Sequence, residues 1–272
     1  AGRIGNWLTI NGKKSPQYSI KENSIARLRF INASNARILK FGSSLKNNNI
    51  ITIDGVAVKP MLVEDFTLAP GQRIDLLINT VDLLKVDFFE ISHTKQLKAF
   101  TLNVTKADNK TKNITNIKFK SNLILPKLDN AKTINVRMQG GAMGNLSKAN
   151  LDGVEKDFRT LATEDKKLWA FNKDIGSYEY LLATVKLNQV VILDVWNDTR
   201  WPHSMHLHGN HFFVKSKEFK DNSDYILRDT YLMQAGEKAK LIFLADNPGK
   251  WLFHCHMLEH AASGIVSYID VV

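Results

Sequence analysis

Two short segments hold most of the potential metal ligands of this chain, and any fold must bring them together. Six of the 8 histidines and the only cysteine lie in 203–208 (HSMHLH) and 251–260 (WLFHCHMLEH). A lone histidine is usually an ordinary polar residue. Clustering around one thiol instead predicts a metal site.

The alternation of side chains along a β-strand divides the ligands of the second segment between two faces. Successive side chains of a strand point to opposite sides of the sheet. If 252–256 is extended, Cys255 faces one way, and His254 and His256 face the other. One metal ion cannot bind all three side chains.

The first segment divides in the same manner. His206 and His208 share one face, and His203 faces the opposite way because it lies an odd number of positions before them. His203 and Cys255 can therefore begin one site, which His260 can complete from the turn after the strand. A thiolate with two imidazoles is the ligand set of a blue copper site, whose axial position is weak or empty.

The opposite face offers a second site made of imidazoles alone. Four neutral imidazoles without a carboxylate suit copper, although zinc accepts them too. The histidines expected on this face are His206, His208, His254 and His256.

Four motifs in the C-terminal half carry a family resemblance. They are HSMHLHG at 203–209, RDT at 228–230, ADNPG at 245–249 and HCH at 254–256. This half resembles the last cupredoxin domain of the multicopper oxidases, the family that contains laccases, cuprous oxidases and ferroxidases.

The resemblance implies copper as the cofactor and a role for each ligand. It makes His203, Cys255 and His260 the type 1 ligands, His206 a type 2 ligand, and His208, His254 and His256 type 3 ligands. Cys255 and its neighbours His254 and His256 would then carry electrons between the sites.

The N-terminal half predicts β-structure throughout. The segment 25–31 (IARLRFI) alternates apolar with polar or small residues, and Asn11-Gly12 is a hairpin turn signal. The segments 28–34, 53–55 and 68–73 resemble the middle cupredoxin domain of the same family. We therefore expect an all-β chain of two cupredoxin-like Greek-key sandwich or barrel domains.

The expected domains are a copper-free one at 1–125 and a copper-binding one at 126–272, joined by a linker at 121–132. His93 is the only histidine of the first domain and is expected to be an ordinary polar residue. Short helices are expected near 145–149 and 256–262.

The chain departs from the family at two positions. Ile265 occupies the axial position of the type 1 site, where an aliphatic side chain cannot bind a metal and the reduction potential should rise. Ala261 stands where some cuprous oxidases carry a glutamate that is credited with proton delivery.

The ligand set also falls short of a complete oxygen-reducing cluster. In the family, two His-x-His motifs of an N-terminal domain supply the remaining imidazoles, and nothing before His203 supplies them here. We expect the chain to be the middle and last domains of a three-domain oxidase. The missing domain would have been removed or would lie on another chain. Otherwise this chain cannot reduce oxygen.

The expected partners are dioxygen and a small reductant or metal-ion substrate. Met138 precedes the Gly-rich loop 139–144 and Met143 lies near its end; both are candidate ligands for a cuprous substrate, because thioethers prefer Cu(I). Methionines also serve as ordinary packing residues.

The net charge of +10 permits binding to nucleic acid, but the lysines are scattered without interleaved aromatic residues. We therefore expect no nucleic-acid partner. No apolar run is long enough to span a membrane, and no signal peptide is evident. The expected location is periplasmic or extracellular.

Two other functions remain open from the sequence. One is a blue-copper electron-transfer protein, which has no need of the four imidazoles on the second face. The other is an inactive binding or structural module that lacks the rest of the cluster.

Overall fold

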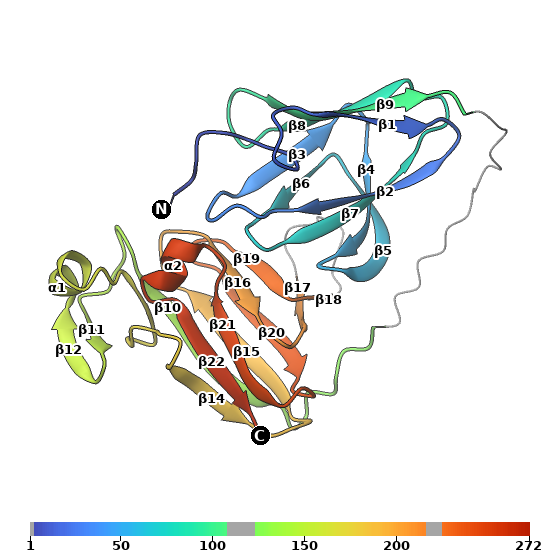
Figure 1. Cartoon of the computed structure of the whole chain (residues 1–272). Coiled ribbons are helices and arrows are strands. Elements are labelled where there is room, and N and C mark those ends of the chain that lie inside the picture. Colours follow the sequence, from blue (N-terminus) through green and yellow to red (C-terminus); the bar gives the residue numbers. More distant parts are fainter. Residues whose placement is uncertain (1–2, 108–122, 216–224) are drawn as a thin grey trace. The chain divides into compact units, whose positions relative to one another are not determined.

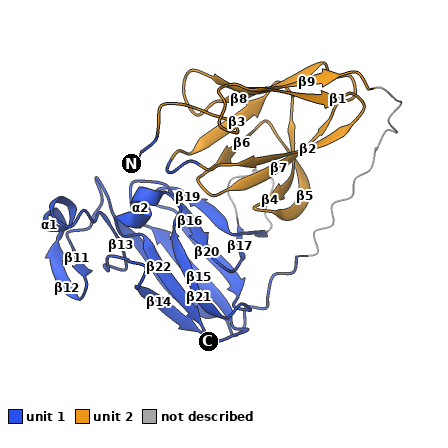
Figure 2. Cartoon of the chain, in the orientation of Figure 1, with its two compact units in different colours: residues 1–4, 34–36, 123–272 blue, residues 5–33, 37–122 orange. Residues whose placement is uncertain are grey.

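The computed structural model describes residues 3–107, 123–215 and 225–272, and the chain divides into two compact units. Unit 2 contains residues 5–33 and 37–122, and unit 1 contains 1–4, 34–36 and 123–272 (Figure 2). Residues 121 and 122 of the expected linker lie outside the described residues. The assignment of a copper-free domain to 1–125 and a copper-binding domain to 126–272 stays a prediction.

Unit 2 is built from two β-sheets (Figure 1). Their strand orders are β1-β9-β8-β3-β6 and β2-β7-β4-β5. The strands are β1 (Gln17–Lys21), β2 (Ile25–Ile31), β3 (Leu39–Ser43), β4 (Asn48–Ile53), β5 (Val56–Val63), β6 (Asp65–Leu68), β7 (Arg73–Asn79), β8 (Lys85–Glu90) and β9 (Leu97–Thr105).

Alternation along β2 explains how unit 2 closes its core. Phe30 points inward and packs edge-on against Phe66, with ring centroids 5.1 Å apart. Arg27 points outward, and its Nε donates to the buried carboxylate of Asp75 on β7 at 2.7 Å. Phe88 and Phe100 stack at 4.5 Å in the same core.

Unit 1 also contains two large sheets, together with a hairpin. The strand orders are β13-β10-β15-β20-β17-β18 and β14-β22-β21-β16-β19, and β11 pairs with β12. Its elements are β10 (Lys132–Gly140), β11 (Lys148–Leu151), β12 (Val154–Asp157), α1 (Phe158–Thr163), β13 (Trp169–Phe171), β14 (Leu181–Val185), β15 (Val190–Asn197), β16 (His203–Leu207), β17 (Phe212–Lys215), β18 (Tyr225–Arg228), β19 (Thr230–Met233), β20 (Lys238–Leu244), β21 (Gly249–Cys255), α2 (Leu258–Ala262) and β22 (Val266–Val271).

The inward face of β15 forms the centre of this unit. Val191, Leu193, Val195 and Asn197 alternate along the strand and are all fully buried. The first three are β-branched or leucine side chains that fill the space between sheets, and Asn197 ends the row with a polar group. Together the two units confirm the expected all-β, cupredoxin-like architecture.

The helices match only in part those expected from the sequence. α2 lies within the expected 256–262, but the expected helix at 145–149 is wrong, because 148–151 form β11. The hairpin from β11 to β12 turns at Asp152 and Gly153, both with positive φ, and this turn chemistry outweighs the helical tendency of the segment. α1 was not expected from the sequence.

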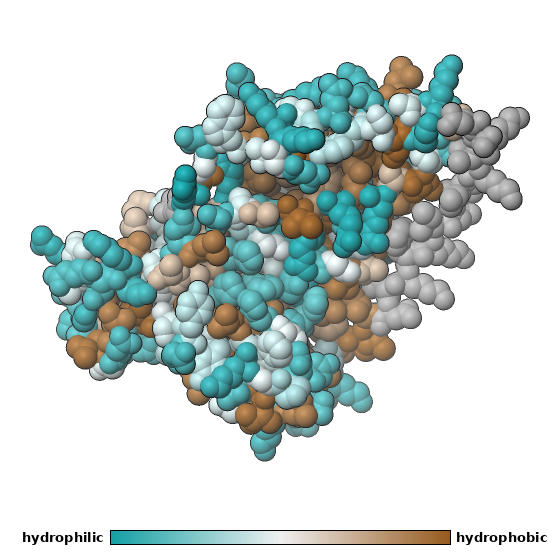
Figure 3. All heavy atoms as spheres, viewed as in Figure 1, coloured by the Kyte–Doolittle hydropathy of each residue, from teal (hydrophilic) through white to brown (hydrophobic). Residues whose placement is uncertain are grey.

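Hydrophobic residues are scattered among hydrophilic ones on the face of the molecule drawn in Figure 3. In the described part of the chain, neither helix is long and apolar enough to cross a membrane.

Candidate metal centre

The two ligand segments lie side by side in one sheet of unit 1. β16 and β21 pair in antiparallel register, with Met205 opposite Cys255 and His206 opposite His254. Directly opposite residues of a pair project from the same face. The register therefore places the thiol on the core face and the two histidines on the other face.

Three candidate ligands meet on the core face: His203 from β16, Cys255 from β21 and His260 from α2. One ligand atom from each lies within 4.8 Å of the other two, and all three side chains are buried. The Cys255 Sγ atom is 3.7 Å from His260 Nδ1, which is 3.1 Å from His203 Nδ1. This is the only such group of histidine, cysteine and acidic residues among those that the structure describes.

The turn after β21 brings His260 back to the thiol. The backbone N–H of His260 donates to Met257 O at 2.9 Å, and the N–H of Ile265 donates to His260 O at 3.0 Å. The N–H of Cys255 donates to Ile265 O, also at 3.0 Å. Ile265, the expected axial residue, is therefore adjacent to two of the three ligands and is fully buried.

This donor set fits copper. A soft thiolate with two imidazoles is the blue-copper ligand type.

Burial keeps these three side chains uncharged. Desolvation raises the pKa of the Cys255 thiol to about 12. It also lowers the pKa of His260 to about 4 and that of His203 well below its ordinary value, in the latter case with help from the neighbouring His260. A metal that binds here must therefore displace the thiol proton but not an imidazolium proton.

Trp169 on β13 packs against both imidazoles, a role that was not expected from the sequence. Its ring centroid lies 4.8 Å from that of His203 and 4.8 Å from that of His260. The indole lies so close to Gly141 that a Cβ atom there would come within 2.2 Å of it. The paired glycines at 140–141 were the only sequence signal for this close approach.

The other face of the strand pair gathers four imidazoles. Ring centroids lie 4.7 Å apart for His206 and His208, 5.6 Å apart for His206 and His254, and 5.8 Å apart for His254 and His256. We call these four residues the imidazole cluster.

Backbone carbonyls fix two of these rings. His206 Nδ1 lies 2.9 Å from Asp229 O, and His254 Nδ1 lies 2.9 Å from Cys255 O. A carbonyl can only accept, so both Nδ1 atoms carry a proton and donate it to these oxygens. His254 Nε2 lies 2.9 Å from His208 Nε2.

The imidazole cluster is also electrostatically suited to a metal. Burial, and then the neighbouring imidazoles, lower the pKa of His254 to about 4 and lower that of His208. His211, which the sequence analysis passed over, lies at the edge, with its Nε2 3.7 Å from the carboxylate of Asp229. His93 is exposed and belongs to unit 2.

The two candidate methionines differ in their surroundings. Met138 is fully buried within β10, whereas Met143 is 74% exposed and has a φ of 62°. The structure does not favour a shared substrate site for this pair, because only the Met143 thioether is accessible.

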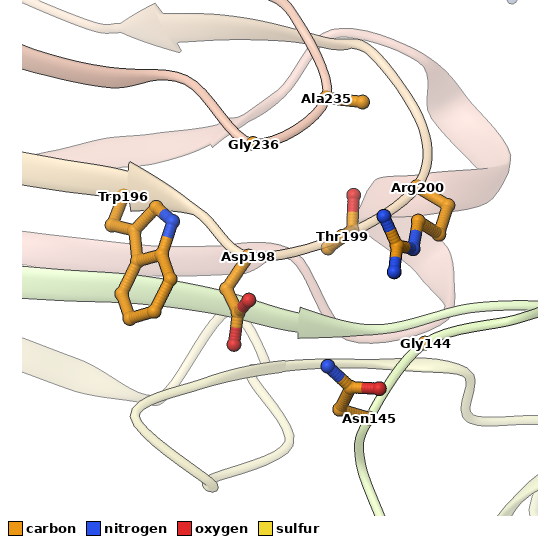
Figure 4. Close-up of a pocket in the computed structure, with 8 residues that line it drawn as sticks. All are labelled: Gly144, Asn145, Trp196, Asp198, Thr199, Arg200, Ala235 and Gly236. Carbon is orange, nitrogen blue, oxygen red and sulfur yellow. The ribbon is translucent and has the colours of Figure 1, made fainter.

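A pocket of about 250 Å³ opens at the end of β15, and one of its lining residues, Thr199, contacts His203 (Figure 4). Trp196, Asp198, Thr199 and Arg200 line it from the end of β15 and the following loop, and Asn145 lies on the facing segment. Arg137 Nε donates to the Asp198 carboxylate at 2.9 Å, which neutralises that charge.

Comparisons with known proteins cover nearly the whole chain. Family models described as multicopper oxidase match residues 2–122 and 151–272. The multicopper oxidase mco of Staphylococcus aureus is 27% identical over 99% of this chain and 53% of its own length. Laccase-12 of Arabidopsis thaliana is 25% identical over 97% of this chain and 63% of its own length.

Solved structures show the same fold. A bacterial laccase-like multi-copper oxidase from Ochrobactrum superposes with a TM-score of 0.78 at 21% identity, over 100% of this chain and 61% of its own. A variant of the McoA multicopper oxidase from Aquifex aeolicus gives 0.77 at 21% identity, also over 100% and 61%. The chain thus spans about half the length of the first curated relatives that it matches.

Proposed function

Because this chain belongs to the multicopper oxidase family, we propose that it forms the middle and last domains of a copper-dependent oxidoreductase with dioxygen as the acceptor. The enzyme would couple the one-electron oxidation of a donor to the reduction of dioxygen to water. Bound copper would supply the redox chemistry at both sites.

The ligand roles follow the two faces of the strand pair. In this proposal His203, Cys255 and His260 bind type 1 copper on the core face. On the opposite face, the imidazole cluster supplies one type 2 ligand, His206, and three type 3 ligands, His208, His254 and His256.

One observation carries the proposal: a single residue joins the two faces. Cys255 belongs to the core-face site, and its covalent neighbours His254 and His256 belong to the imidazole cluster. Strand rise and side-chain lengths give a path on the order of 10 Å between the two sites. A pure electron carrier has no use for the imidazole cluster, so its presence favours the oxidase.

The donor would dock in the pocket beside Thr199. Thr199 lines this pocket and also contacts His203, so a donor held there lies one residue from a core-face ligand. A cuprous or ferrous ion or a phenol remains a candidate donor, and Met143 offers an accessible thioether. The proposed location is periplasmic or extracellular.

The imidazole cluster also indicates a partner. Its four residues are too few to hold three copper ions in bridging geometry, so we propose that an N-terminal cupredoxin domain, in the longer protein or on another chain, supplies the other ligands. His208 is exposed, which leaves this face accessible to such a domain.

Oxygen-electrode measurements test the proposal, with ascorbate or Cu(I) as the donor. The copper-loaded chain should be reduced without sustained oxygen uptake, and adding the separately produced N-terminal domain should start turnover. Sustained uptake by the chain alone, with stoichiometric water formation, would refute the need for a partner.

The core-face site has its own test. The copper-loaded chain should show the intense blue charge-transfer band of a copper thiolate, and Cys255→Ser should abolish it. A chain that stays colourless under oxidising conditions, despite bound copper, would overturn the type 1 assignment.

A further inference from the structure

A buried hydroxyl group contacts the far side of His203. Thr199 Oγ1 lies 3.1 Å from His203 Nε2, whereas the other ring nitrogen, Nδ1, faces His260. Both residues are buried. Which of the two groups donates determines which nitrogen of His203 carries the proton.

The amide of Asn197 determines the answer, because its own orientation is fixed. Its Nδ2 lies 2.8 Å from Trp201 O and 2.8 Å from Gln234 O. Carbonyl oxygens accept only, so the NH₂ group must face them and the amide oxygen must face Thr199. Asn197 is fully buried at the end of the inward face of β15.

The Thr199 hydroxyl proton is therefore donated to a group other than His203. Oγ1 donates to Asn197 Oδ1 at 2.7 Å, with Trp201 O at 3.0 Å as the alternative acceptor. A hydroxyl has one proton, and neither carbonyl oxygen can give one back. Toward His203, Thr199 can only accept.

We propose that Thr199, oriented by Asn197, holds His203 in the tautomer protonated at Nε2 and so presents the Nδ1 lone pair to the metal. The inference rests on the proposed type 1 role of His203 and deepens it. Thr199 is a positioning residue, since it acts on the metal only through His203.

The other ring nitrogen of His203 faces the remaining core-face side chains. His203 Nδ1 lies 3.1 Å from His260 Nδ1, which is itself 3.7 Å from Cys255 Sγ. His203 therefore directs Nδ1 toward the core-face site and Nε2 toward Thr199.

His203 is therefore preorganised to bind a metal ion through Nδ1. Loss of the Thr199 acceptor would remove this preorganisation and leave the Nε2–H group of His203 buried without a partner.

The first test measures the tautomer of His203 directly. Long-range ¹H–¹⁵N correlation spectra of the metal-free chain, labelled with ¹⁵N-histidine, should show His203 protonated at Nε2 and unprotonated at Nδ1. The signal is assigned by its absence in His203→Gln. An Nδ1-protonated His203 would overturn the inference whatever the copper site does.

The second test compares Thr199→Val with Thr199→Ser. Valine has the same shape without the acceptor, so we expect mixed tautomers at His203 and Cu(II) affinity lower by about 10–100-fold. Serine keeps the hydroxyl and should restore both readouts. Unchanged tautomer and affinity in the valine variant would contradict the role of Thr199.

Failure of the inference and failure of the proposed function are distinguishable. If His203 is protonated at Nε2 but the loaded chain shows no blue band, the type 1 assignment fails and the tautomer assignment stands. If the band appears while His203 is protonated at Nδ1, the tautomer assignment fails and the type 1 assignment stands.

Discussion

Burial sets the protonation states of His203, Cys255 and His260. The pH dependence of metal affinity should therefore report the loss of the thiol proton. The Cys255 thiol, with its pKa raised to about 12, is protonated throughout the usual pH range. The imidazoles of His203 and His260 have lowered pKa values, with His260 at about 4, so they are neutral above pH 6. Only one proton therefore competes with the metal in this range.

Copper affinity should consequently rise with pH. Between about pH 6 and pH 9 we expect about a tenfold gain in Cu(II) affinity per pH unit, because each binding event releases one thiol proton. Competition with a chelator of known affinity measures the slope. A flat profile would show that the thiol is already ionised, and a slope near two would show that an imidazole is also protonated.

Ile265 offers a second test at the residue scale. Ile265→Met roughly conserves volume and should cost less than about 1.5 kcal/mol in the free energy of unfolding. A thioether near the metal stabilises the oxidised state relative to isoleucine, so the reduction potential should fall. Redox titration decides this, and an unchanged potential would mean that residue 265 is not axial.

At the scale of elements, the close approach of the loop after β10 to β13 supports the core-face site. Gly141 has a φ of 73°, and a Cβ there would meet the Trp169 ring at 2.2 Å. Gly141→Ala should therefore lower the free energy of unfolding by about 2 kcal/mol or more. It should also shift the blue band, because Trp169 contacts His203 and His260.

Gly153→Ala is the matched control. Gly153 also has a positive φ, 81°, but a Cβ there meets nothing within 4 Å. This variant should lower the free energy of unfolding by about 1–2 kcal/mol, through the strained backbone alone. The blue charge-transfer band should not change. Equal unfolding free energies for the two variants, measured by denaturant titration, would argue against the steric contact.

Only part of the core-face site could be predicted from the sequence. Alternation alone predicted which histidines share a face with Cys255, because the period of two is a local property of any strand. Thr199 and Trp169 could not be found in this way, since their contacts with His203 depend on which strands become neighbours. The helix expected at 145–149 failed for the same reason, because pairing of β11 with β12 is decided beyond the segment itself.

At the scale of the whole molecule, all of the proposed copper ligands belong to unit 1. Unit 2 contributes nine strands and an aromatic core around Phe30. The motifs of both units identify the family, yet the chain spans only about half the length of the first curated relatives. In the proposed function, complete oxygen chemistry would depend on the proposed partner domain.

The shared strand pair has a thermodynamic consequence for the two sites. β16 and β21 carry ligands on both faces, so one cooperative opening of this ladder would break both sites together. A ligand that binds only the closed form on either face makes opening rarer for both, and so raises the affinity of the other face. Cu(I) bound at the core face should thus slow hydrogen exchange at His208 and His256, whose amides donate to Leu252 O and Ser204 O.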